Sequence, residues 1–279
     1  MINFNIGKAN TLIAARQELQ GFYLRGEDPF DQVLLPNAYV PKGFKVGDKI
    51  DVFVYLDNEE RITATTLLPK IQLDDFGCLT VAQVNRMGAF MDMGIVKQLL
   101  VPYKEQASPM EEGKNYVVYM YLDQKTNRLV GTSKLNRYLN NDECSLKKGE
   151  EVDLIVLHST SLGTNVIINK KHKGLIFKSD VNQPLSLGQE IKGFIKTIRE
   201  DNKIDIVLQK EGIASFEPNS DKILEILRRS DGFLNLHDKS DPKEISSRLL
   251  MSKKSFKRAI GNLYRDEKIK IEKDGIRLA

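Results

Sequence analysis

The sequence GKNYVVYMYLDQKTNRLVGTS, residues 113–133, has the pattern of a β-hairpin. A glycine leads into a run rich in Val and Tyr, a polar turn follows, and Arg128 begins a second apolar run. β-Branched and aromatic residues favour strands, whereas Asp, Asn and similar polar residues favour turns. The segment therefore predicts two antiparallel strands joined by a short turn.

The same pattern occurs three times in the first 210 residues. Gly47 leads into IDVFVYLDNEE and then Arg61, and Gly188 leads into IKGFIKTIREDN and then Lys203. The offsets from the glycine to the basic residue are 14, 15 and 15 positions. Such regular spacing indicates an internal repeat of one supersecondary unit.

Each hairpin is preceded by other short apolar runs, none of which has a helical period. They lie at residues 33–35, 99–101 and 175–177, and the second copy also has runs at 80–84 and 88–94. About five short strands in roughly 60 residues cannot bury a core as an open sheet, whereas a closed barrel removes the exposed edges. The sequence therefore predicts tandem five-stranded OB-fold barrels at residues 1–70, 71–140 and 145–212.

The C-terminal segment, residues 218–279, begins with helical signals. Ile223, Ile226 and Leu227 recur at helical spacing, which predicts a first helix. Asp241 followed by Pro242 is a typical helix start, because Asp caps the first turn and Pro fits inside it. We therefore expect two helices before residue 250.

A third helix and a hairpin are expected to complete this segment. Ser252 is a plausible cap, and the predicted buried side consists of Phe256, Ile260, Leu263 and Tyr264. The dipeptide at 274–275, Asp-Gly, is a strong hairpin signal between the two last apolar runs. This order is that of a winged-helix domain, so the expected fold class is mostly β with a C-terminal α+β domain.

Three parts of the second segment together resemble an S1-type RNA-binding domain. They are VAQVNRMGAFMDMG at residues 81–94, LLVP at 99–102, and RLVGTSKL at the end of the hairpin. The third segment, with VDLIVLHSTSLGTNVIIN and GLIF, is more diverged, and the first segment is the most degenerate. The resemblance implies small barrels that bind oligonucleotides.

The tail PKEISSRLLMSKKSFKRAIGNLYRDEKIKIEKDGIRL resembles the winged helix of the bacterial conserved virulence factor B family. That family has three S1-type barrels followed by a winged helix, and the resemblance covers nearly the whole chain. It implies an RNA-binding regulatory protein with no catalytic activity.

Single-stranded RNA is held by stacking of its bases on aromatic rings and by basic groups near its phosphates. The resemblance implies such rings at Phe90 in the second barrel and at Phe177 and Tyr23 in the other two. The expected flanking residues are Arg86, Lys97, Tyr103 and Lys104 in the second barrel and Lys171, Lys173 and Lys178 in the third. The alternatives are that the rings belong to the barrel cores and that the lysines are ordinary solvated residues.

The chain departs from the S1 pattern at two places. Met87 stands where the family often has an aromatic residue before the glycine. Pro36, Pro102 and Phe177 stand where many S1 domains have a histidine after the third strand. These differences imply weaker stacking in each barrel, which several linked sites can offset through effective concentration.

The winged-helix segment is mildly basic, with 15 Lys+Arg against 10 Asp+Glu in residues 219–279. The candidate nucleic-acid contacts on the third helix are Lys253, Lys254, Lys257, Arg258 and Arg265. The alternatives for this face are plain solvation or docking of a protein. Apart from Asn262, the helix lacks the Asn and Gln residues that read bases, which does not favour sequence-specific recognition of DNA.

Composition and motifs exclude several other classes. Cys78 and Cys144 do not form a CxxC pair, and the three histidines have no zinc-ligand spacing. The start, MINFNIGKAN, is not a secretory signal, and no run approaches the ~20 apolar residues that span a bilayer. We therefore expect a cytoplasmic protein with no metal, no cofactor and no membrane contact.

These features bear on three possible functions. The expected one is non-catalytic binding of single-stranded RNA, acting on transcripts or on the translation or transcription machinery. The alternative is a transcription regulator that binds duplex DNA through the winged helix. A nuclease is disfavoured, because the sequence has neither clustered carboxylates for metal ions nor a GxxxxGK[ST], GxSxG or HExxH motif.

Overall fold

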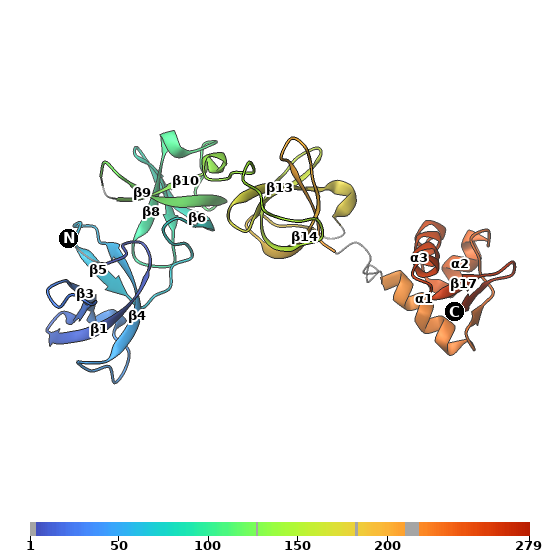
Figure 1. Cartoon of the computed structure of the whole chain (residues 1–279), viewed down its shortest axis with the longest axis horizontal. Coiled ribbons are helices and arrows are strands. Elements are labelled where there is room, and N and C mark those ends of the chain that lie inside the picture. Colours follow the sequence, from blue (N-terminus) through green and yellow to red (C-terminus); the bar gives the residue numbers. More distant parts are fainter. Residues whose placement is uncertain (1–3, 127, 182–183, 210–217) are drawn as a thin grey trace. The chain divides into compact units, whose positions relative to one another are not determined.

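The computed structural model describes residues 4–126, 128–181, 184–209 and 218–279. The chain forms two compact units, Met1–Leu208 and Gln209–Ala279. Three closed five-stranded barrels make up the described part of the first unit, and three helices with a small sheet make up that of the second (Figure 1). The predicted mostly β fold with a C-terminal α+β domain is confirmed.

All three barrels repeat one strand order, which around the first barrel is β1-β2-β3-β5-β4. Its strands are β1 (Ala9–Glu18), β2 (Gly21–Arg25), β3 (Gln32–Pro36), β4 (Lys49–Leu56) and β5 (Ile62–Thr65). Those of the second are β6 (Phe76–Asn85), β7 (Gly88–Asp92), β8 (Gln98–Pro102), β9 (Asn115–Asp123) and β10 (Arg128–Thr132). Those of the third are β11 (Glu151–Ser159), β12 (Gly163–Ile168), β13 (His172–Phe177), β14 (Glu190–Ile198) and β15 (Ile204–Val207). The three repeated hairpins of the sequence are therefore the last two strands of each barrel.

A glycine starts the second strand of each barrel, where the chain crosses very close to the third strand. A Cβ atom at Gly88 would lie 2.3 Å from the carbonyl oxygen of Val101, and one at Gly163 would lie 2.1 Å from that of Ile176. Gly88 also has a φ of +146°, which side-chain-bearing residues rarely adopt. Only glycine fits this crossing, so the same frame is built in barrels whose other residues have diverged.

The first two barrels share a hydrophobic core through β4. Val52 and Val54 point into the first barrel, whereas Phe53 and Tyr55 are buried against the core of the second barrel, including Leu79. A strand buried on both faces reads as a continuous apolar run rather than as an alternation. The run VFVY is therefore the joint between two barrels as well as a barrel strand.

The second and third barrels are joined in the same way through β11. Val152 and Leu154 face the third core, and Ile155 and Leu157 pack against Phe76 of the second barrel. The carboxylate of Asp75 accepts a hydrogen bond from Lys170 at 2.6 Å across the same joint. The second and third barrels therefore pack against each other through apolar contacts and an ion pair.

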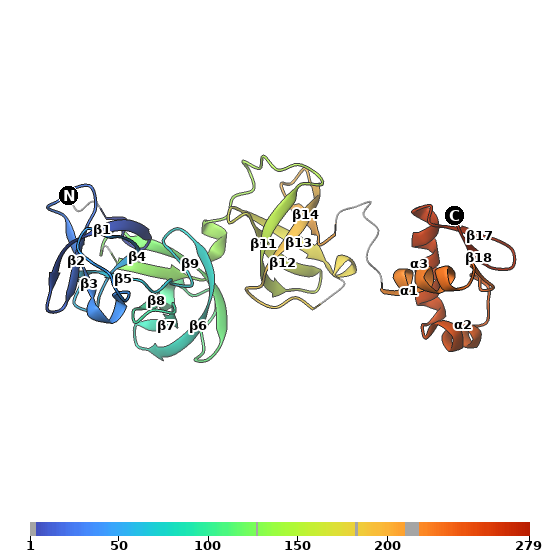
Figure 2. The same cartoon turned by 90° about the horizontal axis from the view of Figure 1, so that it is seen from below.

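The second unit has the winged-helix order (Figure 2). Its elements are α1 (Pro218–Arg229), β16 (Phe233–Leu234), α2 (Pro242–Leu249), α3 (Lys253–Arg265), β17 (Ile269–Ile271) and β18 (Ile276–Leu278). Asp241 caps α2 by accepting from the amide of Lys243 at 2.7 Å, and Ser252 caps α3 by accepting from that of Ser255 at 3.1 Å. Both predicted helix starts are confirmed.

The prediction for the buried side of α3 is wrong at one residue. Phe256, Ile260 and Leu263 are buried, but Tyr264 is 58% exposed. Successive helical residues are turned by about 100° around the axis, which carries the residue after Leu263 out of the core. Tyr264 consequently lies on the outside of α3, in the neighbourhood of its basic residues.

Candidate nucleic-acid interface

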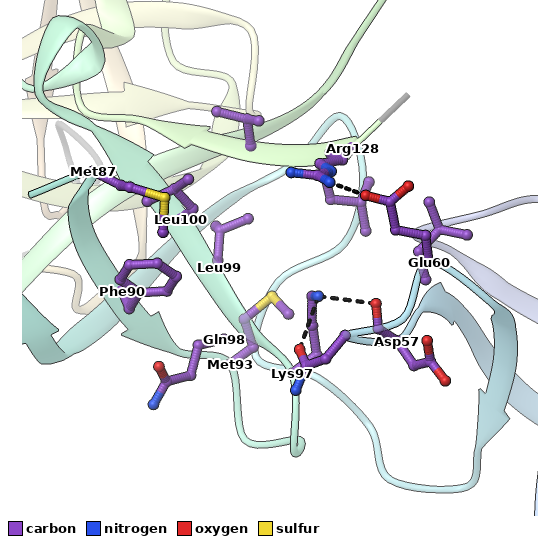
Figure 3. Close-up of a pocket in the computed structure, with 14 residues that line it drawn as sticks. Asp57, Glu60, Met87, Phe90, Met93, Lys97, Gln98, Leu99, Leu100 and Arg128 are labelled. Carbon is purple, nitrogen blue, oxygen red and sulfur yellow. Dashed lines mark hydrogen bonds and ion pairs between the residues drawn. The ribbon is translucent and has the colours of Figure 1, made fainter. Parts of the chain in front are cut away.

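The outer face of the second barrel presents Phe90 between two fully buried residues. Ala89 and Met91 point into the core, and Phe90 is half-buried on the opposite face of β7. It pairs with Leu100 of β8, and the exposed Met87 lies beside it (Figure 3). The alternative that Phe90 fills the barrel core is therefore wrong, because Ala89 and Met91 do so.

Phe90 lines a pocket of about 200 Å³ that continues across β8 and β10 toward the first barrel. One wall is apolar and includes Met87, Leu100 and Val130. The opposite wall is the polar β4–β5 turn of the first barrel (Figure 3). A flat base could contact the apolar wall, because stacking needs an exposed ring and no particular hydrogen bonds.

Lys97 is bound to that turn. Its ammonium group donates to the carbonyl oxygen of Asp57 and to Oδ1 of Asn58, both at 3.1 Å. Burial lowers the pKa of Lys97. Arg128 forms an ion pair with Glu60 of the same turn (Figure 3). The structure therefore gives both cations a role in holding the first barrel against the second.

The remaining candidates of the second barrel lie near the β6–β7 turn and after β8. Arg86 is exposed in the turn, and the Tyr103 hydroxyl donates to the carbonyl oxygen of Asn85 at 2.7 Å. Lys104 is exposed, and its own carbonyl oxygen accepts a hydrogen bond from Lys134 at 2.7 Å. The Tyr103 ring is thereby fixed beside the turn that carries Met87.

Tyr23 occupies the position of Phe90 in the first barrel. Each is the third residue of its second strand, after the crossing glycine, and Tyr23 pairs with Leu34 as Phe90 pairs with Leu100. The Arg16 guanidinium lies 4.0 Å from the centroid of the Tyr23 ring. The accessible face of this tyrosine is thus already in contact with a cation.

In the third barrel the corresponding residue is Asn165, which overturns the expected match of Phe177 to Phe90. Asn165 pairs with Leu175, whereas Phe177 pairs with the crossing glycine, Gly163. In the second barrel, Pro102 is the residue that pairs with its crossing glycine. Phe177 therefore belongs to the end of the third strand, and the Arg199 guanidinium lies 5.4 Å from its ring centroid.

A pocket of about 350 Å³, lined by both apolar and charged residues, lies on this face of the third barrel. Arg199 makes two hydrogen bonds to Asp205 there, at 2.9 Å from Nε and 2.8 Å from Nη2. Asp205 is only 8% exposed, and its hydrogen bond raises the pKa of Arg199. A paired guanidinium and carboxylate thus stand where the second barrel has an apolar wall.

The three lysines predicted for the third barrel differ in whether they line this pocket. Lys173 lines it, and its Nζ donates to Oδ1 of Asn136 at 3.2 Å. Lys171 is exposed just before β13, and Lys178 is exposed in the short helix after it. Of the three, only Lys173 contributes to the pocket surface.

The outward side of α3 carries the predicted cations of the second unit. Lys254, Lys257, Arg258 and Arg265 are exposed, and Lys253 is half-buried. Lys257 lies 4.0 Å from a carboxylate oxygen of Asp238, and Arg265 donates to Asn262 at 3.4 Å. The sole amide side chain on this helix is thus already paired with an arginine of its own helix.

Sequence reasoning missed several residues of the two faces. Arg128 and Lys203 belong to the repeat, and their shared offset from the glycine predicts matching faces for them. Asn165 and Arg199 carry no aromatic or glycine signal of their own. Asn165 is the third residue of the second strand of its barrel, but this place identifies it only once the strand register is known.

Among the residues that the structure describes, no three of His, Cys, Asp and Glu lie close enough together to hold a metal ion. None of the described helices has the length and apolar character needed to cross a membrane.

Comparison with known proteins agrees with this architecture. The S1 domain family matches residues 6–67 and 76–134, and the CvfB-like winged helix domain family matches residues 221–278. Conserved virulence factor B of Staphylococcus epidermidis is 26% identical over 245 residues, which cover 84% of this chain and 81% of that protein. The chain belongs to the conserved virulence factor B family.

Other relatives span a similar length. A Bacillus subtilis protein called uncharacterized protein YitL is 28% identical over 274 residues, 94% of this chain and 90% of that protein. A crystal structure of a multidomain protein with nucleic acid binding domains from Streptococcus pneumoniae is 24% identical, covers 99% of both chains and has a TM-score of 0.43. The S1 and winged-helix domains of the conserved virulence factor B family are domains of nucleic-acid-binding type.

Proposed function

We propose that the protein binds single-stranded RNA without catalysis and regulates gene expression by occupying transcripts or by contacting the translation or transcription machinery. The observation that carries the proposal is Phe90, an outward ring beside Met87 and Leu100 on the face that S1-type barrels use for oligonucleotides. Stacking on such a ring contributes about 1–3 kcal/mol per base. Acting on transcripts also fits a cytoplasmic protein.

The helix α3 is proposed as a second nucleic-acid contact. Lys254 and Lys257 lie on its exposed side, and the wing hairpin adds Lys270 and Lys273. Such groups attract phosphates without reading bases. The proposal therefore treats the winged helix as a source of charge rather than of sequence recognition.

A fluorescence-anisotropy titration of the full chain tests the proposal. Single-stranded RNA should bind more tightly than duplex DNA of the same sequence at equal salt. Phe90→Ala should weaken RNA binding about tenfold through lost stacking. Phe30→Ala is the matched control, because Phe30 is 92% exposed in the β2–β3 loop and lies outside both pockets.

A transcription regulator that acts through duplex DNA is the second candidate, favoured by the basic side of α3. It predicts that duplex DNA binds more tightly and that Phe90→Ala changes nothing. The double variant Lys254→Gln, Lys257→Gln should lower the salt dependence whichever nucleic acid binds. The Phe90 result and the order of the two affinities thus distinguish the candidates.

A further inference from the structure

The pocket on the third barrel differs in chemistry from the pocket on the second. Asn165 replaces the aromatic ring, and Leu162 and Leu175 supply apolar surface beside it. Arg199, Asp205 and Lys173 supply the polar side. A face of this kind can hold a flat ring between apolar groups and also present hydrogen-bonding groups to its edge.

The side-chain amide of Asn165 has spare hydrogen-bonding capacity. Its Nδ2 lies 3.4 Å from Nε2 of His158 and 3.5 Å from the carbonyl oxygen of His158, both at the outer limit for a hydrogen bond. Its Oδ1 has no hydrogen-bond partner within the described ranges of the chain. An amide offers a donor and an acceptor side by side.

The surroundings hold this side of the pocket in place. Arg199 is fixed by its two hydrogen bonds to Asp205, and Asn141 closes the far edge by bonding the backbone of Lys173. Asn141 also donates to the carbonyl oxygen of Asn202 at 2.8 Å. The groups around Asn165 are thus fixed before any ligand arrives, which lowers the entropic cost of binding.

We propose that this pocket reads one unpaired adenine of the RNA, with the Asn165 amide accepting from the exocyclic N6 amino group and donating to N7. That donor–acceptor pair on adenine matches an amide side chain. Leu162 and Leu175 contact the base, and Lys173 and Lys203 lie at the pocket edge toward the phosphates. The inference rests on the proposed function, because it specifies how one barrel recognises single-stranded RNA.

The test uses two RNA 12-mers, one of adenosine and one of 7-deazaadenosine, in anisotropy titrations of the full chain. The deaza base keeps its size and stacking surface but lacks the N7 acceptor. The unaltered protein should bind the adenosine oligomer about fivefold more tightly, the effect of one hydrogen bond. Asn165→Leu should bind the two oligomers equally.

Two further variants make the result specific. Asn165→Asp keeps the size of the side chain but is an acceptor only and has no donor for N7, so it should lose the preference for the adenosine oligomer. Gln98→Leu removes an amide from the face of the second barrel and should retain the fivefold difference. Because each comparison is made within one variant, a change in overall stability does not mimic the expected result.

Each remaining outcome counts against one proposal or both. If the unaltered protein binds both oligomers equally, or if Asn165→Leu still discriminates, the adenine-reading pocket is overturned while RNA binding stands. If the protein binds neither oligomer but binds single-stranded RNA of mixed sequence, the adenine pocket alone is overturned. If it binds none of these RNAs, single-stranded RNA binding itself is overturned, and the adenine pocket with it.

Discussion

The second and third barrels have the same strand frame but present different side chains at the same position of their outer faces. Both place a glycine at the tight crossing and an outward residue two positions later, but that residue is Phe90 in one and Asn165 in the other. The first of these faces is bounded by a turn of the neighbouring barrel, and the second by its own Arg199 and Asp205. The backbone fixes the position of the outward residue, and the side chain there determines whether the face offers a ring for stacking or an amide for hydrogen bonds.

The largest expected effects test the shared frame. Gly88→Ala and Gly163→Ala should each destabilise the first unit by more than about 2 kcal/mol, because the added Cβ would overlap a backbone carbonyl oxygen. Chemical denaturation followed by circular dichroism would measure both. Gly26→Ala is the control, because Gly26 lies in the same unit, is not in the left-handed φ region, and has its nearest atoms 3.9 Å from an added Cβ. Similar losses in the two barrels would support a common frame, and tolerance of either change would break it.

The next effect concerns the ion pair between Arg199 and Asp205, which the face of the third barrel has and that of the second barrel lacks. Arg199→Met should destabilise the barrel, because Asp205 would be left buried without its partner, and an unsatisfied buried polar group costs roughly 1–3 kcal/mol. Lys203→Met is the control, because its ion pair with Asp201 is exposed and contributes little. Equal denaturation midpoints for these two variants would show that Asp205 does not depend on Arg199.

Swapping the residue types at one pair of matching positions on the second and third barrels should change the salt dependence of RNA binding. Lys173 and Gln98 occupy matching positions, since Lys173 pairs with Ile167 and Gln98 with Asp92. Lys173→Gln should lower the slope of log K against log salt by about 0.7, the value for one phosphate contact on a single strand, and Gln98→Lys should raise it by about as much. Slopes that stay constant in both variants would mean that the RNA backbone does not pass these positions.

The smallest effect is expected at Lys97. Its ammonium group is held by Asp57 and Asn58, so Lys97→Gln should leave the salt slope of RNA binding unchanged. The same variant should cost less than about 1 kcal/mol of stability, measured by denaturation, because the pair of hydrogen bonds is partly exposed. If Lys97→Gln reduced the slope as much as Lys173→Gln, Lys97 would instead be a contact to a phosphate.

The sequence predicts the three hairpins and the winged helix because each depends on local patterns. The repeated glycine, the β-branched runs and the Asp241 and Ser252 caps are all readable within a few residues. The outward position of Phe90 also follows from alternation once β7 is located.

The parts that sequence reasoning missed depend on partners far away in the chain. Lys97 looks like any flanking lysine until the first barrel is seen to bind it. Asn165 was overlooked because Phe177 offered an aromatic ring nearby, and only the pairing with Leu175 reveals which residue matches Phe90. The run VFVY is unbroken and apolar because it is buried on both faces, and such a run does not by itself indicate which neighbour covers its second face.

The shared core at β4 has a consequence for how the chain can be divided and recombined. Phe53 and Tyr55 come from the first barrel and fill space in the core of the second. Cutting the chain between the two barrels would leave a cavity in the second barrel and exposed aromatic rings on the first. Such a fragment would tend to aggregate, and its failure to bind a ligand would carry no information about that ligand. The first two barrels are therefore not independent modules that can be separated or exchanged. Their order in the chain is constrained by packing as well as by ligand recognition.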